Sequence, residues 1–261
     1  MRVIGAAIGF GRRLVCPHEA RAVRENLRYL GLGNDERTIE ATFEAFGQFV
    51  AELLWGLHVG PQMIANRWRI EGMGHLHDLN RQAKGWILAG AHVGNWEHLG
   101  ALADRLDRRL VAPTGTQLHP LLSAWIKRRK HRWGIDSVPA SRGLRGLTRA
   151  LDRGRLVALP IDGGSFRRGI GVRLCGRPVR MAAGAARLSR LSGRPIVPVF
   201  STRTGFARQH VVIHPPLWPT SPAEQITQHL ADLLGDHLRR ARGQWCIFRP
   251  IERGEERCPA Q

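Results

Sequence analysis

The chain has 261 residues, 43% of them hydrophobic, and 40 lysine and arginine residues against 21 aspartate and glutamate residues give it a formal net charge of +19. This apolar content excludes a disordered chain, and the length suffices for a sizeable core. The positive charge favours anionic partners: nucleic acid, anionic lipid head groups or an acidic carrier protein. The cysteines lack a Cys-x-x-Cys pair, which argues against a disulfide framework or a zinc site and fits a reducing compartment. They are Cys16, Cys175, Cys246 and Cys258.

The N-terminal residues combine a short apolar run with basic residues. The run covers residues 3–11 and stops at Arg12 and Arg13. A bilayer-spanning helix needs about 18 to 20 apolar residues, so this run is too short to cross a membrane. We therefore expect residues 1–18 to form a membrane-surface segment or a truncated membrane anchor.

Periodicity and turn residues predict alternating helices and strands along the rest of the chain. In order, we expect helices 19–30 and 35–57, strand 67–72, helix 76–83, strand 86–91, a helix from about Glu97 to Leu106, strand 109–112, helix 120–133, strand 135–138, helix 143–153, strand 156–161, a hairpin of residues 172–174 and 178–180, helix 182–192, strands 196–200 and 210–214, and helix 221–242. This alternation predicts an α/β fold, with a largely parallel central sheet flanked by helices. We expect a single domain over residues 1–261.

The stretch from residue 86 to residue 98 carries the clearest chemical pattern. Its apolar run ends at His92, a turn with Gly94 and Asn95 follows, and Glu97 stands five positions after His92. Residues five apart on one helix point away from each other, so His92 and Glu97 meet only if the turn folds His92 back. Glu97 would then fix the imidazole tautomer and support its protonated form. A histidine at the core edge and an ordinary helix-start glutamate explain the spacing equally well.

Two further polar features follow apolar segments. Asp162 comes directly after the expected strand 156–161, in a position like that of His92 after its own strand. A turn-forming aspartate before two glycines explains Asp162 equally well. The basic residues 127–130 lie towards the end of an expected helix, where their charges suit the helix dipole.

The order of these segments resembles a known family. Residues 91–97, Ala-His-Val-Gly-Asn-Trp-Glu, resemble the His-x-x-x-x-Asp/Glu signature of glycerolipid and glycolipid acyltransferases. They are most similar to the Gly-His-x-Gly-Asn-Trp-Glu form in the late acyltransferases of lipid A biosynthesis. Further similar segments are residues 25–28, 69–72, 151–154, 159–162, 197–200 and 244–245.

The resemblance implies an O-acyltransferase at the cytoplasmic face of the inner membrane, bound peripherally to an anionic surface. It would move a fatty acyl chain from acyl carrier protein or acyl-CoA to a hydroxyl of a lipid A precursor or related glycolipid, without a cofactor or a metal. By analogy with the family, His92 would act as general base on the hydroxyl, and Glu97 would orient it and stabilise the imidazolium.

The resemblance also implies four substrate-binding residues. A basic residue, Arg129 or its neighbour Arg128, would stabilise the developing oxyanion or hold phosphate. Asp162 falls where the family carries a further acidic residue, and Asn95 belongs to the histidine motif itself.

The chain differs from the family in one motif, and two other protein classes are alternatives to an acyltransferase. The family's Tyr-Arg-Pro is replaced by residues 111–114, Val-Ala-Pro-Thr, which leaves open a different lipid or a secondary metabolite as acceptor. A metal hydrolase would use histidines such as His75, His77 and His98, but the required His-Glu-x-x-His spacing is absent. A nucleic-acid-binding protein would explain the charge of +19, but no recognised motif supports it and we expect no nucleic-acid partner.

Overall fold

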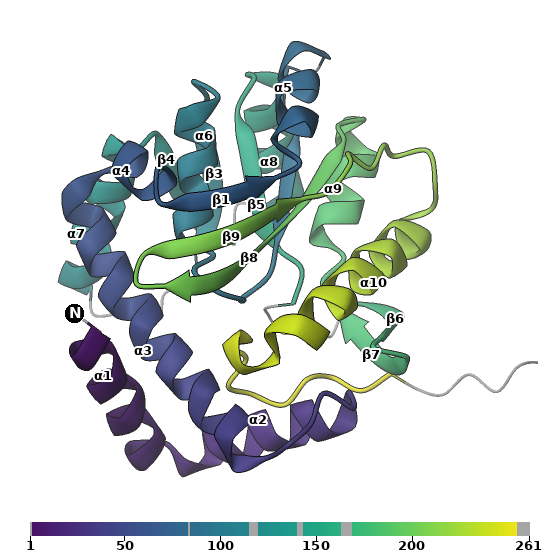
Figure 1. The fold of residues 1–261 in the computed structure, drawn as a ribbon. Coiled ribbons are helices and arrows are strands. Elements are labelled where there is room, and N and C mark those ends of the chain that lie inside the picture. The colour runs from purple at the N-terminus through teal and green to yellow at the C-terminus, as the bar shows by residue number, and fades with distance from the viewer. Residues whose placement is uncertain (1, 83, 115–119, 140–142, 163–168, 255–261) are drawn as a thin grey trace, which may run out of the picture.

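The computed structural model describes residues 2–82, 84–114, 120–139, 143–162 and 169–254. Its strands are β1 (Trp68–Glu71), β2 (Ile87–Gly90), β3 (Leu110–Thr114), β4 (Ile135–Pro139), β5 (Leu156–Pro160), β6 (Ile170–Leu174), β7 (Arg177–Met181), β8 (Ile196–Gly205) and β9 (Arg208–Ile213). Seven of the described strands form one sheet in the order β1-β9-β8-β2-β5-β3-β4, and β6 and β7 form a separate hairpin (Figure 1). Neighbours in the sheet run parallel except for the antiparallel pair β8 and β9, so the predicted largely parallel sheet is confirmed.

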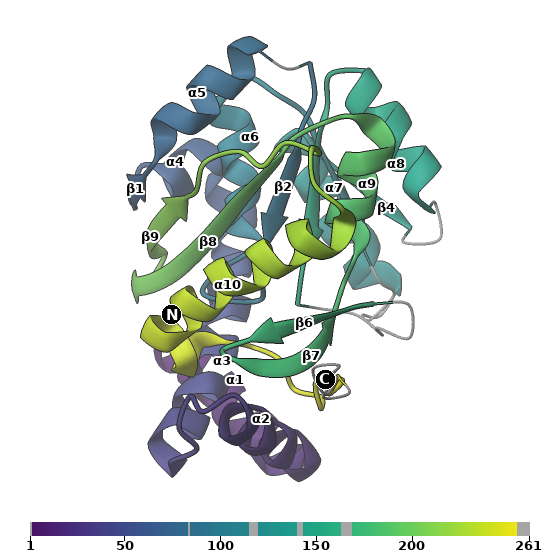
Figure 2. The same cartoon turned by 90° about the vertical axis from the view of Figure 1, so that its right-hand side faces the viewer.

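Helices cover both faces of this sheet (Figure 2). They are α1 (Arg2–Val15), α2 (Pro17–Tyr29), α3 (Glu36–Val59), α4 (Pro61–Ala65), α5 (Met73–Gln82), α6 (Ala101–Arg105), α7 (Pro120–Arg132), α8 (Gly143–Asp152), α9 (Gly184–Ser192) and α10 (Ala223–Ala241), with short 3₁₀ turns η1 (His98–Gly100) and η3 (Arg242–Gln244). In β2, Ile87 and Ala89 belong to one core cluster, together with residues of α2, α8, α9 and α10, whereas Leu88 belongs to a second cluster with residues of α4, α5 and α6. Burial of both faces requires strands that are apolar throughout, as β2 is.

α1 lies within the predicted segment 1–18 and includes Arg12 and Arg13, which form ion pairs with acidic side chains of α2 and α3. Two other observed elements differ from the sequence-based expectation. β8 continues past Phe200, where the apolar run ends, to Gly205, because β9 pairs with it. α4 is an additional short helix that follows Gly60, whose φ of 89° breaks α3.

The direction of the central strands shows at which end of the molecule a ligand site is expected. The arrow of β2 points towards the end that holds α1, α2 and the β6–β7 hairpin (Figure 2). β5 and β8 run parallel to β2, so the carboxyl ends of the three central strands share this edge. Ligand sites of open α/β sheets lie at that edge.

α1 lies against α3 through a backbone contact between glycines. Gly47 of α3 faces Gly5 and Gly9 of α1, and a β-carbon added at Gly47 would collide with the carbonyl oxygen of Gly5. Arg12 of α1 extends the contact, because its guanidinium lies 3.9 Å from the ring centre of Phe46. Within the described ranges, no helix combines the length and the apolar character needed to span a bilayer.

Gly47→Ala is expected to destabilise the contact between α1 and α3. Overpacking costs about 1–3 kcal/mol, and a clash with backbone atoms cannot be relieved by a rotamer change. Alanine also favours a helix by about 1 kcal/mol over glycine, so the net loss is expected to be smaller. Amide hydrogen exchange of α1 measures it. Gly11→Ala is the matched control, because a β-carbon at Gly11 meets no atom within 4 Å; equal protection of α1 in both variants would contradict the expectation.

Candidate active site

His92 and Asp162 occupy equivalent positions at the carboxyl edge of the sheet. β2 and β5 are neighbours, and their register pairs Gly90 with Pro160. Each of the two polar residues comes two positions after its strand partner, so the sheet itself brings them together. The sequence places both at strand ends, but the adjacency of β2 and β5 emerges only from the fold.

The Asp162 carboxylate holds His92 with two hydrogen bonds. The Nδ1–H group of His92 donates to Oδ1 of Asp162 at 2.8 Å, and the backbone N–H of His92 donates to Oδ2 at 2.9 Å. The Asp162 side chain is 2% exposed and that of His92 is 26% exposed. Asp162 is therefore buried behind the imidazole and bound to it. Its expected role in substrate binding stays a prediction.

The C-terminal segment lies against this pair. The indole N–H of Trp245 donates to Oδ2 of Asp162 at 2.8 Å. The backbone N–H of Cys246 donates to the carbonyl oxygen of His92 at 2.8 Å. Sequence reasoning missed the contact between Trp245 and Asp162; its only signal was the family-like segment 244–245.

Glu97 forms an ion pair with Lys130 of α7 instead of the predicted contact with His92. The Lys130 side chain is buried, whereas that of Glu97 is 30% exposed. Glu97 lies in the turn just before η1, so it precedes the helix in whose first turn we expected it. The correction has a simple cause: Asp162 already occupies Nδ1 of His92, and Lys130 offers Glu97 an opposite charge.

The basic run at the end of α7 points in several directions. Lys130 faces inward to Glu97, whereas Arg128 is exposed. The guanidinium of Arg129 lies 5.6 Å from the ring centre of Trp125. Lys130 is therefore the residue of this run that reaches Glu97. Arg128 and Arg129, which we expected at the site, are its neighbours in the chain.

Neighbouring charges and burial determine the protonation states of His92, Glu97 and Asp162. Burial opposes a charge on His92, but the charge and hydrogen bond of Asp162 outweigh it, so the pKa of His92 is raised above 6.5. Burial would raise the pKa of Glu97, yet the Lys130 charge lowers it below its ordinary value. Burial likewise opposes ionisation of Asp162, whereas His92 and Trp245 lower its pKa. Both carboxylates are therefore ionised near neutral pH.

Asn95 has no surface available for a substrate. Its side chain is fully buried, its Nδ2 donates to Oε2 of Glu52 at 2.9 Å, and its Oδ1 accepts from the backbone N–H of His98 at 3.2 Å. This corrects the expected substrate contact: Asn95 shapes the turn. His98 is buried too, and burial lowers its pKa to about 4. In the part of the chain that the structure describes, no group of three or more His, Cys, Asp or Glu side chains is placed to hold a metal ion.

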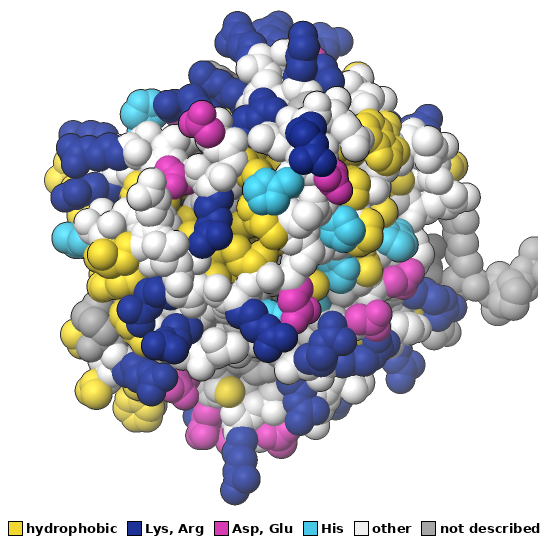
Figure 3. Space-filling view, turned by 45° about the horizontal axis from the view of Figure 1, so that its top comes forward, with side chains coloured by type: hydrophobic (Ala, Val, Ile, Leu, Met, Phe, Trp, Pro, Cys, Tyr) yellow, Lys and Arg dark blue, Asp and Glu magenta, His cyan; other side chains and the backbone are white. Residues whose placement is uncertain are grey.

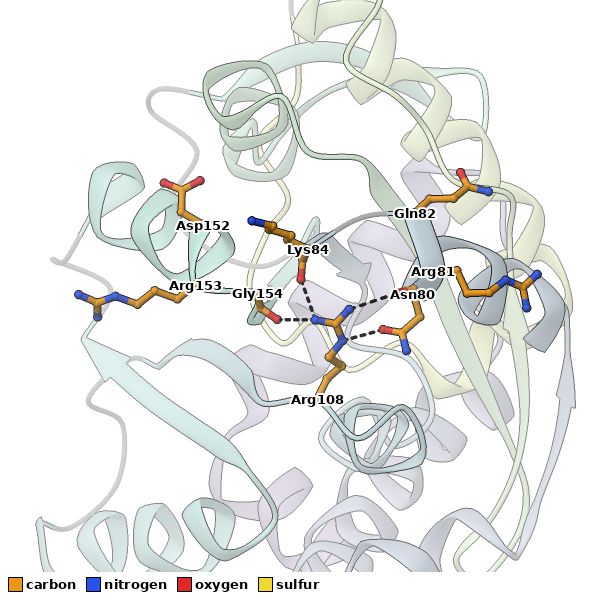
Figure 4. Close-up of a pocket in the computed structure, with 8 residues that line it drawn as sticks. All are labelled: Asn80, Arg81, Gln82, Lys84, Arg108, Asp152, Arg153 and Gly154. Atoms are coloured by element: carbon orange, nitrogen blue, oxygen red, sulfur yellow. Dashed lines mark hydrogen bonds between the residues drawn. The ribbon is translucent and has the colours of Figure 1, made fainter.

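A cavity of about 460 Å³ lies elsewhere, at the amino ends of β2, β3 and β5 (Figure 4). The Arg108 guanidinium occupies its centre and donates to the carbonyl oxygens of Lys84 and Gly154 and to Oδ1 of Asn80. The other basic side chains at the cavity, Arg81 and Arg153 among them, point away from Arg108 (Figure 4). Arg108 therefore connects the chain segments around this cavity through its hydrogen bonds. The candidate active site lies at the other edge of the sheet, where the strands have their carboxyl ends.

Comparisons with known proteins show the family to which the chain belongs. Residues 4–251 match the family described as "Bacterial lipid A biosynthesis acyltransferase". The phosphatidylinositol mannoside acyltransferase of Mycobacterium tuberculosis strain H37Rv is 27% identical over 221 residues, which cover 80% of this chain and 68% of that protein. The homologue in strain CDC 1551 gives the same values. The 1-acyl-sn-glycerophosphate acyltransferase PlsC from Thermotoga maritima is a structural neighbour with a TM-score of 0.44 and 14% identity, covering 94% of this chain and 99% of that one.

Proposed function

Because the chain belongs to the bacterial lipid A biosynthesis acyltransferase family and is an acyltransferase, we propose that His92 is the general base that transfers a fatty acyl chain from a thioester to a lipid hydroxyl. The observation that carries the proposal is the bond between Nδ1 of His92 and the buried Asp162 carboxylate. With the proton on Nδ1, the lone pair of Nε2 is available to accept a proton. The partly exposed imidazole can therefore meet a substrate hydroxyl at the sheet edge.

The proposed reaction has one nucleophilic step followed by loss of the thiolate. Nε2 of His92 removes the hydroxyl proton while the hydroxyl oxygen forms a bond with the thioester carbonyl carbon. The carbon–sulfur bond then breaks, and the thiolate takes the proton back from the imidazolium. Asp162 stabilises the imidazolium throughout, and the Lys130 ammonium places a positive charge beside the turn. Arg128 and Arg129 are the proposed contacts for a substrate phosphate.

The proposed donor is acyl carrier protein or acyl-CoA, both of which are anionic. The charge of +19 supports this choice, and Lys and Arg side chains are spread over the face seen in Figure 3. The proposed acceptor is a hydroxyl of a lipid A precursor or a related glycolipid. The name of the mycobacterial homologue makes a phosphatidylinositol mannoside a second acceptor of the same class.

The test of this function is acyl transfer by the purified chain. Acyl carrier protein and CoA thioesters with a labelled acyl group would be offered separately, each with a lipid A precursor and with a phosphatidylinositol mannoside. We expect a labelled lipid ester with at least one pair, identified by mass spectrometry. Hydrolysis of the thioester by water with no labelled lipid from any pair would overturn the proposal.

We propose that residues 1–261 act as one domain, bound peripherally to the cytoplasmic face of the inner membrane through residues 1–18. The outward face of α1 supports this, because it exposes large apolar side chains on the side opposite Gly5 and Gly9. The exposed set is Val3, Ile4, Phe10, Leu14 and Val15. An exposed apolar stripe along one face is typical of a helix that lies in the membrane interface.

Leu14→Asp is expected to weaken vesicle binding at least tenfold. Leu14 is 65% exposed, and burying a leucine side chain contributes about 1.5–3 kcal/mol, where 1.4 kcal/mol is about a tenfold change. Co-sedimentation with vesicles containing anionic phospholipid measures the effect. The matched control is Leu191→Asp on α9, because Leu191 is 57% exposed. If both variants lost the same vesicle binding, any added negative charge would weaken binding, and this result would contradict a specific role for α1.

A further inference from the structure

A buried ion pair lies directly behind the turn that follows His92. Glu52 of α3 is 0% exposed, and the Arg203 side chain of β8 is 9% exposed. Nε and Nη2 of Arg203 donate to Oε1 and Oε2 of Glu52 at 2.9 and 3.2 Å. The proposed reaction uses neither residue, and both lie on elements far from His92 in the chain.

The contacts of this pair converge on the turn. Glu52 accepts from Nδ2 of Asn95 through its carboxylate, and from Nε2 of His98 at 3.0 Å through its backbone carbonyl. Nη2 of Arg203 donates to the carbonyl oxygen of Gly94 at 3.4 Å. Two residues of the turn, Gly94 and Asn95, are thus bound to the side chains of the ion pair, and His98 of η1 is bound to the backbone of Glu52.

The same carboxylate also holds the tip of the β8–β9 hairpin. The backbone N–H of Ala207 donates to Oε1 of Glu52 at 2.9 Å. Ala207 has a φ of 52°, a left-handed conformation that alanine rarely adopts. A residue keeps such a conformation when its surroundings over-determine it. Glu52 therefore links α3, the hairpin and the turn at a single point.

The backbone of the turn has little room for an alternative shape. Gly94 has a φ of 63°, and a β-carbon there would lie 2.6 Å from the carbonyl oxygen of Ser201. The hydroxyl of Ser201 donates to the carbonyl oxygen of Val93 at 3.1 Å. Residues 93, 94, 95 and 98 are thus fixed, while the side chains of His92 and Glu97 are left partly exposed.

Stability alone is a poor explanation for the pair. Removing two charges from water costs several kcal/mol per ion, and well-packed apolar residues often replace a buried ion pair without loss of stability. What apolar residues cannot supply is the set of directed hydrogen bonds to the turn. Displacement of a reacting group by about 1 Å can lower a rate about 10²-fold, so such bonds have a direct consequence for catalysis.

We propose that Glu52 and Arg203 are positioning residues for acyl transfer, which fix the turn after β2 so that His92 meets the acceptor hydroxyl. This proposal rests on the proposed function of His92. It predicts that loss of the pair lowers kcat and leaves substrate binding nearly unchanged, because neither side chain touches the substrate.

The test is the double variant Glu52→Gln/Arg203→Met, which leaves no unpaired buried charge behind. We expect kcat to fall about 10²-fold, with the KM of donor and acceptor within about twofold of wild type. The matched control is Asp136→Asn/Arg155→Met, which removes an ion pair of 2.6 Å between the start of β4 and the residue before β5. The control is expected to keep its kcat.

Two readouts separate a positioning role from a purely structural one. Circular dichroism gives the folded fraction, and kcat is calculated per folded enzyme. Nuclear magnetic resonance of ¹⁵N-labelled histidine follows the titration of His92 without any substrate; we expect it to shift in the double variant and not in the control. A folded double variant with wild-type kcat and an unchanged His92 titration would overturn the proposal.

If the double variant does not fold, Arg203→Lys provides the second test. Lysine keeps a positive charge beside Glu52 but lacks the second nitrogen that reaches Gly94. We expect a folded enzyme with a lower kcat and a shifted His92 titration; wild-type values for both would overturn the proposal. Absence of acyl transfer in the wild-type chain would refute the proposed function instead, and the His92 titration would still test the positioning role.

Discussion

His92→Ala is expected to lower kcat for acyl transfer by about 10³-fold, within the 10² to 10⁴-fold contribution typical of a general base. The imidazole is the group at the sheet edge that is both partly exposed and held by a buried carboxylate. Without it, the hydroxyl has to lose its proton to water. Initial rates with a labelled thioester and a glycolipid acceptor measure the loss.

His77→Ala is the control for this variant, because His77 is an exposed histidine of α5, a helix at the opposite end of the molecule from α1 and α2 (Figure 2). It is expected to keep the wild-type rate. Circular dichroism has to show that His92→Ala is folded. A folded variant with unreduced kcat would remove His92 from the mechanism while leaving the family assignment intact.

Asp162→Asn is expected to have the second largest effect, a fall in kcat of about 10²-fold from a misoriented imidazole. It should also move the pH profile. The Asp162 carboxylate raises the pKa of His92 above 6.5, and His92 must be neutral to accept a proton. In the wild type, kcat/KM therefore rises with pH through this raised pKa. Without the carboxylate the pKa of His92 falls, so the acidic limb of the variant moves to lower pH.

Glu97→Gln is the comparison that identifies the partner of His92. It also removes a carboxylate near the imidazole, but the charge of Glu97 raises the pKa of His92 less than Asp162 does. The acidic limb of kcat/KM should therefore shift less in Glu97→Gln than in Asp162→Asn. A larger shift in Glu97→Gln would restore the pairing of His92 with Glu97 that the sequence suggested.

Much of the fold was predictable because local patterns specify it. The apolar runs that became β2 and β5 are buried on both faces, and the periodic segments between the strands became helices. The position of His92 just after a strand followed from the same patterns. β8 was predicted too short because its second half, from Ser201 onward, is polar and is held as a strand by pairing with β9.

The contacts of the site could not be read from the sequence, since they depend on strand order and helix phase. Glu97 is close to His92 in the chain, whereas Asp162 is 70 positions away and meets it only because β5 lies beside β2. In the basic run of α7, rotation about the helix axis decides that Lys130 faces Glu97. Glu52 gave no sequence signal, because it lies on a helix whose other inward residues are mostly apolar.

The contact of α1 with α3 has a geometric consequence for acceptor choice. Gly47 and Glu52 are five residues apart on one helix, which corresponds to about 7.5 Å along its axis. Gly47, which contacts α1, and Glu52, which is bound to the turn after His92, thus keep a fixed separation on one helix. With α1 in the lipid surface as proposed, the imidazole stands at a constant height above the bilayer. The enzyme would then select acceptors by depth, acylating hydroxyls at that level and passing over those on head groups that extend further into the water.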